Sequence, residues 1–195
     1  MEQPQLINQV FDAIDAINKA DPNMELLEDI ELPAALLYGT RMSSMLERFA
    51  PQAPEVVQIA ARAQHIKRWA IPRSDYPTGK KGYYDWRQTL GKKHAEWTGE
   101  ILASLGYDQQ VIERVGALLR KERLKADPEC QQLEDVICLV FLAHYAEAFA
   151  AQHTEEKVID ILQKTWRKMS DAGHAYALEQ SYPSAVQGLI AKALG

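Results

Sequence analysis

Three side chains in the sequence could together hold a divalent metal: His65, His94 and Asp135. Imidazole nitrogens and carboxylate oxygens are common metal ligands, and a metal bound by them lowers the pKa of a coordinated water. None of the five histidines occurs in an HExxH motif or another short ligand spacing, so such a site must be assembled from separate helices. The chemistry expected of Mn, Fe, Co or Mg at this site is hydrolysis of a phosphate ester.

Each of these residues also has a structural interpretation. Both histidines lie at the edge of an apolar helix face, where an imidazole commonly serves as a hydrogen-bond partner. Asp135 stands directly before the apolar run 136–143, and a carboxylate at the start of a buried helix needs a cation, a metal or a hydrogen-bond donor. Arg62 or Arg87 could supply that cation, so the two interpretations stay open at this point.

A second chemical feature is a basic segment that runs from Arg62 to His94. Its 33 residues contain nine Lys or Arg against two acidic residues, a net charge of +7. The rest of the chain contains 13 basic against 25 acidic residues, a net charge of −12, and the whole chain carries −5. The segment also contains five of the 16 aromatic residues. The overall charge excludes a uniformly basic nucleic-acid coat, whereas its distribution favours one local anion site.

Basic groups interleaved with aromatic rings suit a flat anionic ligand, since guanidinium groups match phosphate oxygens and rings stack on bases. We therefore predict a small anionic ligand or a nucleotide as partner, with RNA as a further candidate. A solvated basic face over core aromatics is the structural alternative. The chain has no Walker loop and no dinucleotide fingerprint. The residues expected to contact the phosphate are Arg62, Arg68, Arg73, Arg87 and Lys121.

Apolar residues recur at helical spacing through almost the whole chain, which predicts an all-α fold. At this length we expect a single compact domain over residues 1–195, with about eight or nine helices and no strands. The Asp-Pro pair at 127–128 is a typical helix start, with Asp as N-cap and Pro at the first position. The expected helices cover residues 6–17, 33–49, 55–69, 84–105, 109–119, 128–151, 155–166, 170–179 and 184–194.

The sequence predicts a cytoplasmic protein. The longest apolar stretch, 136–143, is far shorter than the roughly 20 residues that a membrane helix requires. The N-terminus lacks the basic and apolar regions of a secretory signal. Cys130 and Cys138 lie eight residues apart, which is no metal or redox spacing, so we expect two free thiols. The oligomeric state stays open.

Several strings along the chain resemble an uncharacterised family, a domain-of-unknown-function family whose members are occasionally labelled glutamyl-tRNA synthetase. The resemblance covers about residues 5–180. The chain lacks the parallel α/β pattern and the signature motifs of a synthetase. The strings are AARAQHIKRW (60–69), IPRSDYP (71–77), GYYDWR (82–87), LEDV (133–136) and KTWRKMS (164–170).

A weaker resemblance is to the HD-domain metal-dependent phosphohydrolases, which are all-helical. His65 is similar to the first histidine of that family, Asp135 to its final aspartate and His94 to the extra histidine of some members. This resemblance implies an HD-like fold and a metal-dependent phosphohydrolase. The chain departs from the family because it has no His-Asp dipeptide, and the expected loop offers only Asp75 or Asp85.

Three functions follow as expectations. The first is a metal-dependent phosphohydrolase that acts on a nucleotide or another phosphate ester. The second is a non-catalytic nucleotide- or RNA-binding module that uses segment 62–94. The third is an interaction protein whose basic segment docks on an acidic surface, including that of a second copy. Convergence of the two histidines with the aspartate would favour the first, and clustered arginines without that convergence would favour the second.

Overall fold

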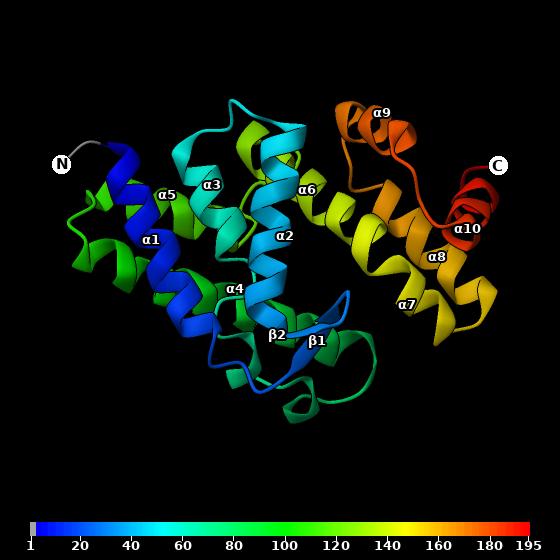
Figure 1. Cartoon of the computed structure of the whole chain (residues 1–195), viewed down its shortest axis with the longest axis horizontal. Helices are drawn as coiled ribbons and strands as arrows, with labels where there is room; N and C mark the ends of the chain where they lie inside the picture. The colour runs from blue at the N-terminus through cyan, green and yellow to red at the C-terminus, as the bar shows by residue number, and fades with distance from the viewer. Residues whose placement is uncertain (1–2) are drawn as a thin grey trace.

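The computed structural model describes residues 3–195 of the chain. These residues form ten α-helices, two short 3₁₀ helices and one antiparallel two-stranded hairpin, so the all-α prediction is confirmed (Figure 1). The elements are α1 (Gln3–Asn18), β1 (Met24–Leu27), β2 (Ile30–Pro33), α2 (Ala34–Phe49), α3 (Glu55–Arg62), η1 (Arg68–Ala70), η2 (Arg73–Asp75), α4 (Gly79–Ser104), α5 (Gln109–Leu119), α6 (Pro128–His144), α7 (Ala146–Ala151), α8 (Glu155–Trp166), α9 (Asp171–Glu179) and α10 (Ser184–Leu194).

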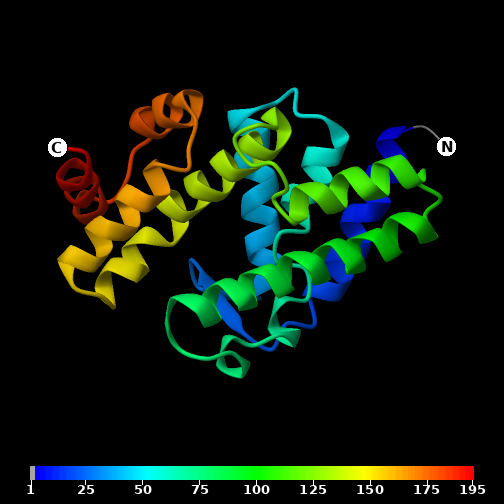
Figure 2. The same cartoon turned by 180° about the vertical axis from the view of Figure 1, so that it is seen from behind.

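Helix α6 joins two groups of helices. Helices α1 to α5 lie together on the N-terminal side, where α4 packs along α5 (Figure 2). Helix α6 contacts α2 and α3 at one end and leads into α7 to α10 at the other, so the termini lie at opposite ends (Figure 1). Leu133, Val136 and Leu139 are at most 1% exposed, which confirms that α6 is a central, buried helix.

The start of α6 shows how local sequence sets an element. Asp127 precedes it, and its side chain accepts hydrogen bonds from the backbone N–H groups of Glu129 and Cys130, while Pro128 occupies the first turn. These bonds satisfy amides that have no partner within the helix. The predicted Asp-Pro start is therefore confirmed, and it anchors the chain that carries Glu134 and Asp135.

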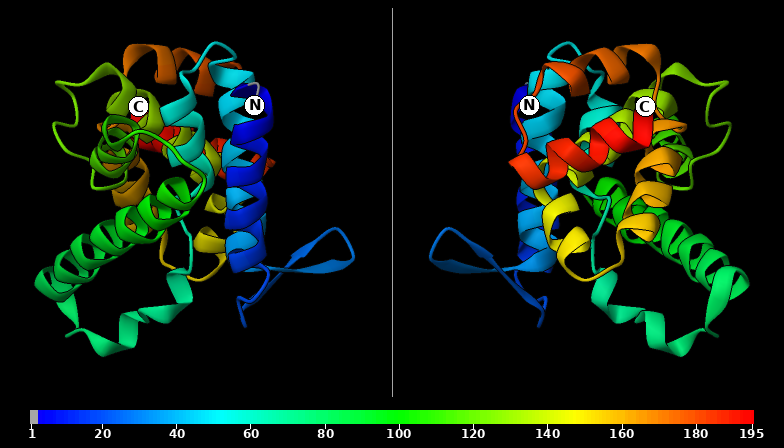
Figure 3. Two further views of the ribbon diagram at one scale, coloured as in Figure 1. Left: turned by 90° about the vertical axis from the view of Figure 1, so that its left-hand side faces the viewer. Right: turned by 90° about the vertical axis from the view of Figure 1, so that its right-hand side faces the viewer.

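The hairpin β1–β2 was not predicted. Its strands pair with Met24 opposite Pro33 and Leu27 opposite Ile30, and most of its residues are exposed on both faces. Without a buried face, the strands do not show the alternation of apolar and polar residues from which a strand is usually inferred. The hairpin and the segment 68–82 extend from the same end of the helical body (Figure 3).

Three helix boundaries differ from the prediction. Helix α3 ends at Arg62 instead of residue 69, because the chain turns and Lys67 adopts a left-handed conformation with φ of 50°. Helix α4 begins at Gly79 instead of residue 84, and α6 ends at His144, after which α7 is a separate helix. The first difference matters most, since it places His65 in a turn and Arg68 at the start of the 3₁₀ helix η1. No described helix is long and apolar enough to span a bilayer.

Candidate functional site

One face of α4 carries the first half of the site. Positions 83, 87, 90, 94 and 97 are spaced by four and three residues, which places them on one side of a helix. Leu90 and His94 are 1% and 4% exposed, so the middle of this face is buried, whereas Tyr83 at its end is 48% exposed. The face therefore runs from solvent at Tyr83, past Arg87, to the core at His94.

The turn that follows α3 supplies the second half. The imidazole of His65 stacks on the ring of Tyr38, from α2, with a centroid separation of 3.5 Å and an interplanar angle of 13°. The guanidinium of Arg68 lies over Trp86 of α4, 4.5 Å from the ring centroid. The backbone N–H of Lys67 donates to Asn18 Oδ1 at 3.0 Å, which helps to hold the left-handed turn between these two residues.

Two arginines and two histidines of these elements interact electrostatically. Burial, followed by the nearby charges of Arg68 and Arg87, lowers the pKa of His94 to about 3. Burial likewise holds the pKa of His65 well below its usual range, with Arg68 as the next cause. Burial and the charge of Arg87 lower the pKa of Arg68 to about 10. Both imidazoles are therefore neutral at neutral pH and lie beside two guanidinium charges. We call these four residues the basic cluster.

Several polar atoms in and beside the basic cluster have no hydrogen-bond partner within residues 3–195. They include the buried atoms Arg68 Nη1, His94 Nε2, Gln64 Nε2 and Thr98 Oγ1. Gln64 precedes His65 in the turn, and Thr98 follows His94 by one turn of α4. Arg87 has neither an ion pair nor a hydrogen bond in the same described region. Since buried polar atoms are nearly always paired, this region is suited to a ligand that brings its own polar groups.

The ion pair of Glu134 with Lys121 adjoins the basic cluster. Glu134 is 2% exposed, its carboxylate bonds to Lys121, and Lys168 Nζ lies 3.7 Å away. Burial acts to raise the pKa of Glu134, but the two lysines and Arg87 lower it below its usual range. Lys121, which the sequence predicts as a phosphate contact, is therefore paired with a buried carboxylate in the structure.

Asp135 does not join the histidines. Its carboxylate accepts hydrogen bonds from the backbone N–H of Ser170 at 2.7 Å, the hydroxyl of Ser170 at 2.6 Å and the side-chain amide of Gln131 at 3.1 Å. A Cβ atom added to Gly173 would lie 2.8 Å from Asp135 Oδ1, so α9 packs closely against this carboxylate. The structure thus gives Asp135 hydrogen-bond donors, one of the kinds of partner that the sequence allowed, in place of Arg62 or Arg87.

Two other predicted phosphate contacts have protein partners. Arg62 Nε donates to Asp15 Oδ1 at 2.8 Å, and a second nitrogen of the same guanidinium pairs with the other carboxylate oxygen. Arg73 donates to the carbonyl oxygens of Tyr76 and Pro77 at 2.8 and 2.9 Å, within its own loop. These bonds occupy both side chains, so Arg62 joins α3 to α1 and Arg73 stabilises the segment before α4.

No group of three or more His, Cys, Asp or Glu side chains in residues 3–195 is arranged to hold a metal ion. His65 and His94 interact electrostatically, whereas the third predicted ligand, Asp135, is bound to Ser170. Cys130 and Cys138 are buried and free, as expected, and burial raises the pKa of both thiols. The predicted set of three metal ligands is therefore not assembled.

Sequence reasoning did not identify Tyr38, Gln64 or Thr98. Tyr38 lies 27 residues before the histidine on which it stacks, and no spacing rule joins two residues on different elements. Thr98 could have been found from its position four residues after His94, on the same face of α4. Gln64 could have been found as a polar residue next to a candidate ligand.

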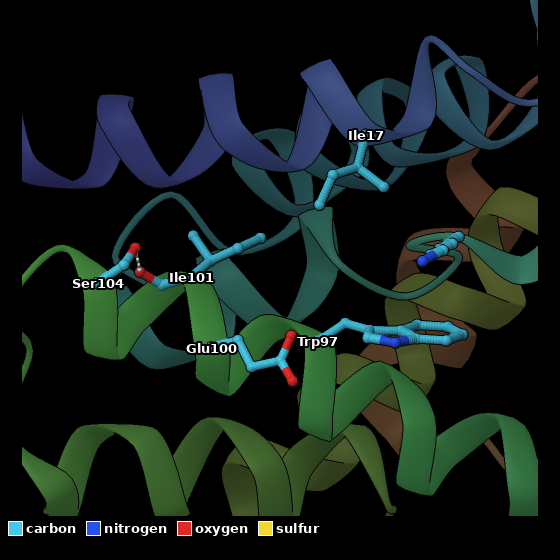
Figure 4. Close-up of a pocket in the computed structure, with 6 residues that line it drawn as sticks. Ile17, Trp97, Glu100, Ile101 and Ser104 are labelled. Carbon is cyan, nitrogen blue, oxygen red and sulfur yellow. Dashed lines mark hydrogen bonds between the residues drawn. The ribbon is translucent and has the colours of Figure 1, made fainter.

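Two hollows on the surface lie outside the basic cluster, whose four residues line neither of them. The first, of about 310 Å³, lies between α1 and α4, where Ile17 points toward α4 (Figure 4). The second, of about 320 Å³, includes Phe11, Ser43 and Gln58. Trp97 belongs to the first hollow and lies 6.3 Å from His94 between ring centroids. The residues that line the first hollow are Ile17, Lys67, Trp97, Glu100, Ile101 and Ser104.

The fold and the basic cluster define an all-α protein in which two arginines and two neutral histidines meet between helices. The chain belongs to the DUF4202 family, a domain of unknown function, which it matches over residues 8–190. The predicted membership of a domain-of-unknown-function family is therefore confirmed. No curated protein and no solved structure matches the chain.

Proposed function

We propose that the protein binds the phosphate group of a small phosphate ester at the basic cluster. The observation that carries this proposal is that Arg68 and Arg87 interact electrostatically, beside two neutral imidazoles, and that neither guanidinium forms an ion pair in the described part of the chain. Two guanidinium groups provide planar pairs of donors that match phosphate oxygens. A dianion would also relieve the mutual repulsion of the two charges.

The histidines have a supporting role in this proposal. His65 is half-buried and its ring is oriented by Tyr38, so it can donate to a phosphate oxygen from a defined position. His94 lies deeper and offers Nε2. An anion next to an imidazole raises the pKa of that imidazole.

The metal-dependent phosphohydrolase is the second candidate function. It is favoured by two neutral imidazoles in proximity, because the neutral form is the one that binds a metal. It is disfavoured by the position of Asp135, whose carboxylate is bonded to Ser170. We derive no catalytic step from it. For the location we propose the cytoplasm, since both cysteines are free.

Calorimetric titration of the intact chain with sulfate and with ribose 5-phosphate tests the proposal. We expect both to bind, and we expect Arg87→Gln to weaken binding by about 10- to 100-fold, the value of one charge-assisted hydrogen bond of ~1.5–3 kcal/mol. Lys92→Gln is the matched control, because Lys92 is an exposed cation on the same helix and its replacement removes the same charge. Equal losses in both variants would indicate a general charge effect and would contradict the proposed site.

Two further arms of the titration separate the alternatives. With Mn present, one tightly bound ion per chain and Mn-dependent ester cleavage would favour the phosphohydrolase. With a single-stranded RNA, a steep fall in affinity with salt would indicate contacts to several phosphates, whereas one phosphate predicts a shallow dependence. We expect the shallow dependence, since only Arg68 and Arg87 of the five predicted contacts are unpaired in the described residues.

A further inference from the structure

An exposed aromatic ring lies next to the basic cluster. Tyr83 is 48% exposed and precedes Arg87 by four residues on α4, so the two side chains are neighbours about one helical turn, ~5.4 Å, apart. Its ring centroid lies 5.9 Å from that of Trp86, at 53°.

The ring of Tyr83 packs against that of Trp86, which is itself fixed in place. Trp86 is 8% exposed, its indole N–H donates to the carbonyl oxygen of Ile71 at 2.8 Å, and its ring carries the guanidinium of Arg68. Trp86 thus joins Tyr83 and Arg68 in one group whose members are held in place by a buried, hydrogen-bonded indole. An aromatic ring that is rigidly held loses little conformational freedom when a second ring stacks on it.

The charges around Tyr83 also favour an anionic ligand. Asp85, the acidic residue nearest in sequence, is paired with Lys81 at 2.6 Å. Lys80 lies over the ring of the next residue, Tyr84, at 5.9 Å from its centroid. The carboxylate of Asp85 thus has a cationic partner, and Lys80 adds positive charge to that of the basic cluster.

We infer that Tyr83 is a stacking platform for a nucleobase, so that the ligand of the basic cluster is a nucleoside monophosphate. This inference rests on the proposed function. The phosphate contacts Arg68 and Arg87, the base lies on the exposed ring of Tyr83, and the ribose spans the helical turn between them. Stacking on a protein aromatic tolerates any base, so this geometry selects nucleotides over other phosphate esters without selecting among the bases.

Titration of the intact chain with AMP and with ribose 5-phosphate tests this inference, since the two ligands differ by the base alone. We expect the wild type to bind AMP roughly tenfold or more tightly than ribose 5-phosphate. Tyr83→Ala should remove that difference while leaving the affinity for ribose 5-phosphate unchanged. Tyr83→Phe should restore it, because a phenyl ring stacks without the hydroxyl.

Tyr84→Ala is the matched control. Tyr84 is 54% exposed and adjoins Tyr83, whose ring it meets edge-on at 6.2 Å between centroids, so its removal should reduce the preference for AMP less than Tyr83→Ala does. Equal wild-type affinities for AMP and ribose 5-phosphate would overturn the inference and leave the phosphate site intact. A loss of AMP affinity in Tyr84→Ala instead of Tyr83→Ala would also overturn it. If neither ligand binds, the proposed function itself has failed.

Discussion

Acidification from pH 7 to pH 4.5 is expected to destabilise the fold by several kcal/mol. The unfolded chain has a histidine pKa near 6.5, whereas burial and then Arg68 and Arg87 hold the pKa of His94 at about 3 in the folded state. Between these values the unfolded state binds a proton that the folded state does not. The contribution of His94 is thus fully present above pH 6.5 and is lost at about 1.4 kcal/mol per pH unit as the pH falls.

Urea unfolding at a series of pH values measures this loss. His65, whose pKa is also held low by burial, adds to the slope in the same direction. The carboxyl of Asp127 has its pKa lowered to about 2 by its hydrogen bonds with Arg114, so its contribution is lost only below about pH 4, outside this window. His94→Gln should reduce the slope of the unfolding free energy against pH by the contribution of one proton, about 1.4 kcal/mol per pH unit. A wild type of constant stability from pH 7 to 4.5 would contradict a buried neutral His94.

Asp135→Ala is expected to lower the free energy of unfolding by about 3 kcal/mol or more and to leave anion binding unchanged. The substitution removes an acceptor that is 2% exposed and leaves the backbone N–H and hydroxyl of Ser170 without it. Hydrogen bonds to a charged group contribute about 1.5–3 kcal/mol each, and an unpaired buried donor adds a further cost. Helix α9 should be the element that loosens, because Ser170 is its N-cap.

Asp171→Ala is the control for this substitution. Asp171 is an exposed carboxylate in the first turn of α9, so its removal should cost less than about 1 kcal/mol, through the helix dipole alone. Urea unfolding and sulfate titration of both variants give the comparison. If Asp135→Ala kept wild-type stability but lost its ligand, Asp135 would belong to the site after all.

The sequence located the candidate site to within one segment. Arg68, Arg87 and both histidines of the basic cluster fall within the +7 region, since a local excess of charge can be counted without a structure. Helix caps and the spacing of apolar residues could also be recognised in the sequence, as the start of α6 shows. Such features depend on residues that are neighbours along the chain.

The sequence did not show which partners the buried and charged side chains bind, because those partners are distant along the chain. Glu134 and Asp135 are consecutive and both buried, and the roughly 100° of helix rotation between them places one beside Lys121 and the other beside Ser170. Because the run 136–143 that follows them is apolar on every side, no periodicity distinguishes the two. Arg62 belongs to the same basic segment as Arg68, but its partner is Asp15, 47 residues away. Pairings of this kind are set by helix packing.

The two cysteines make the protein convenient for spectroscopy in solution. Cys130 and Cys138 are 1% and 3% exposed, and burial raises the pKa of Cys138 to about 12, so neither thiol is available to a maleimide in the native state. A cysteine introduced at Leu26 on the hairpin, which is 66% exposed, would therefore take a dye or spin label selectively. A second label on segment 68–82 would then report the distance between these two extensions as a ligand is added, with both native thiols left in place.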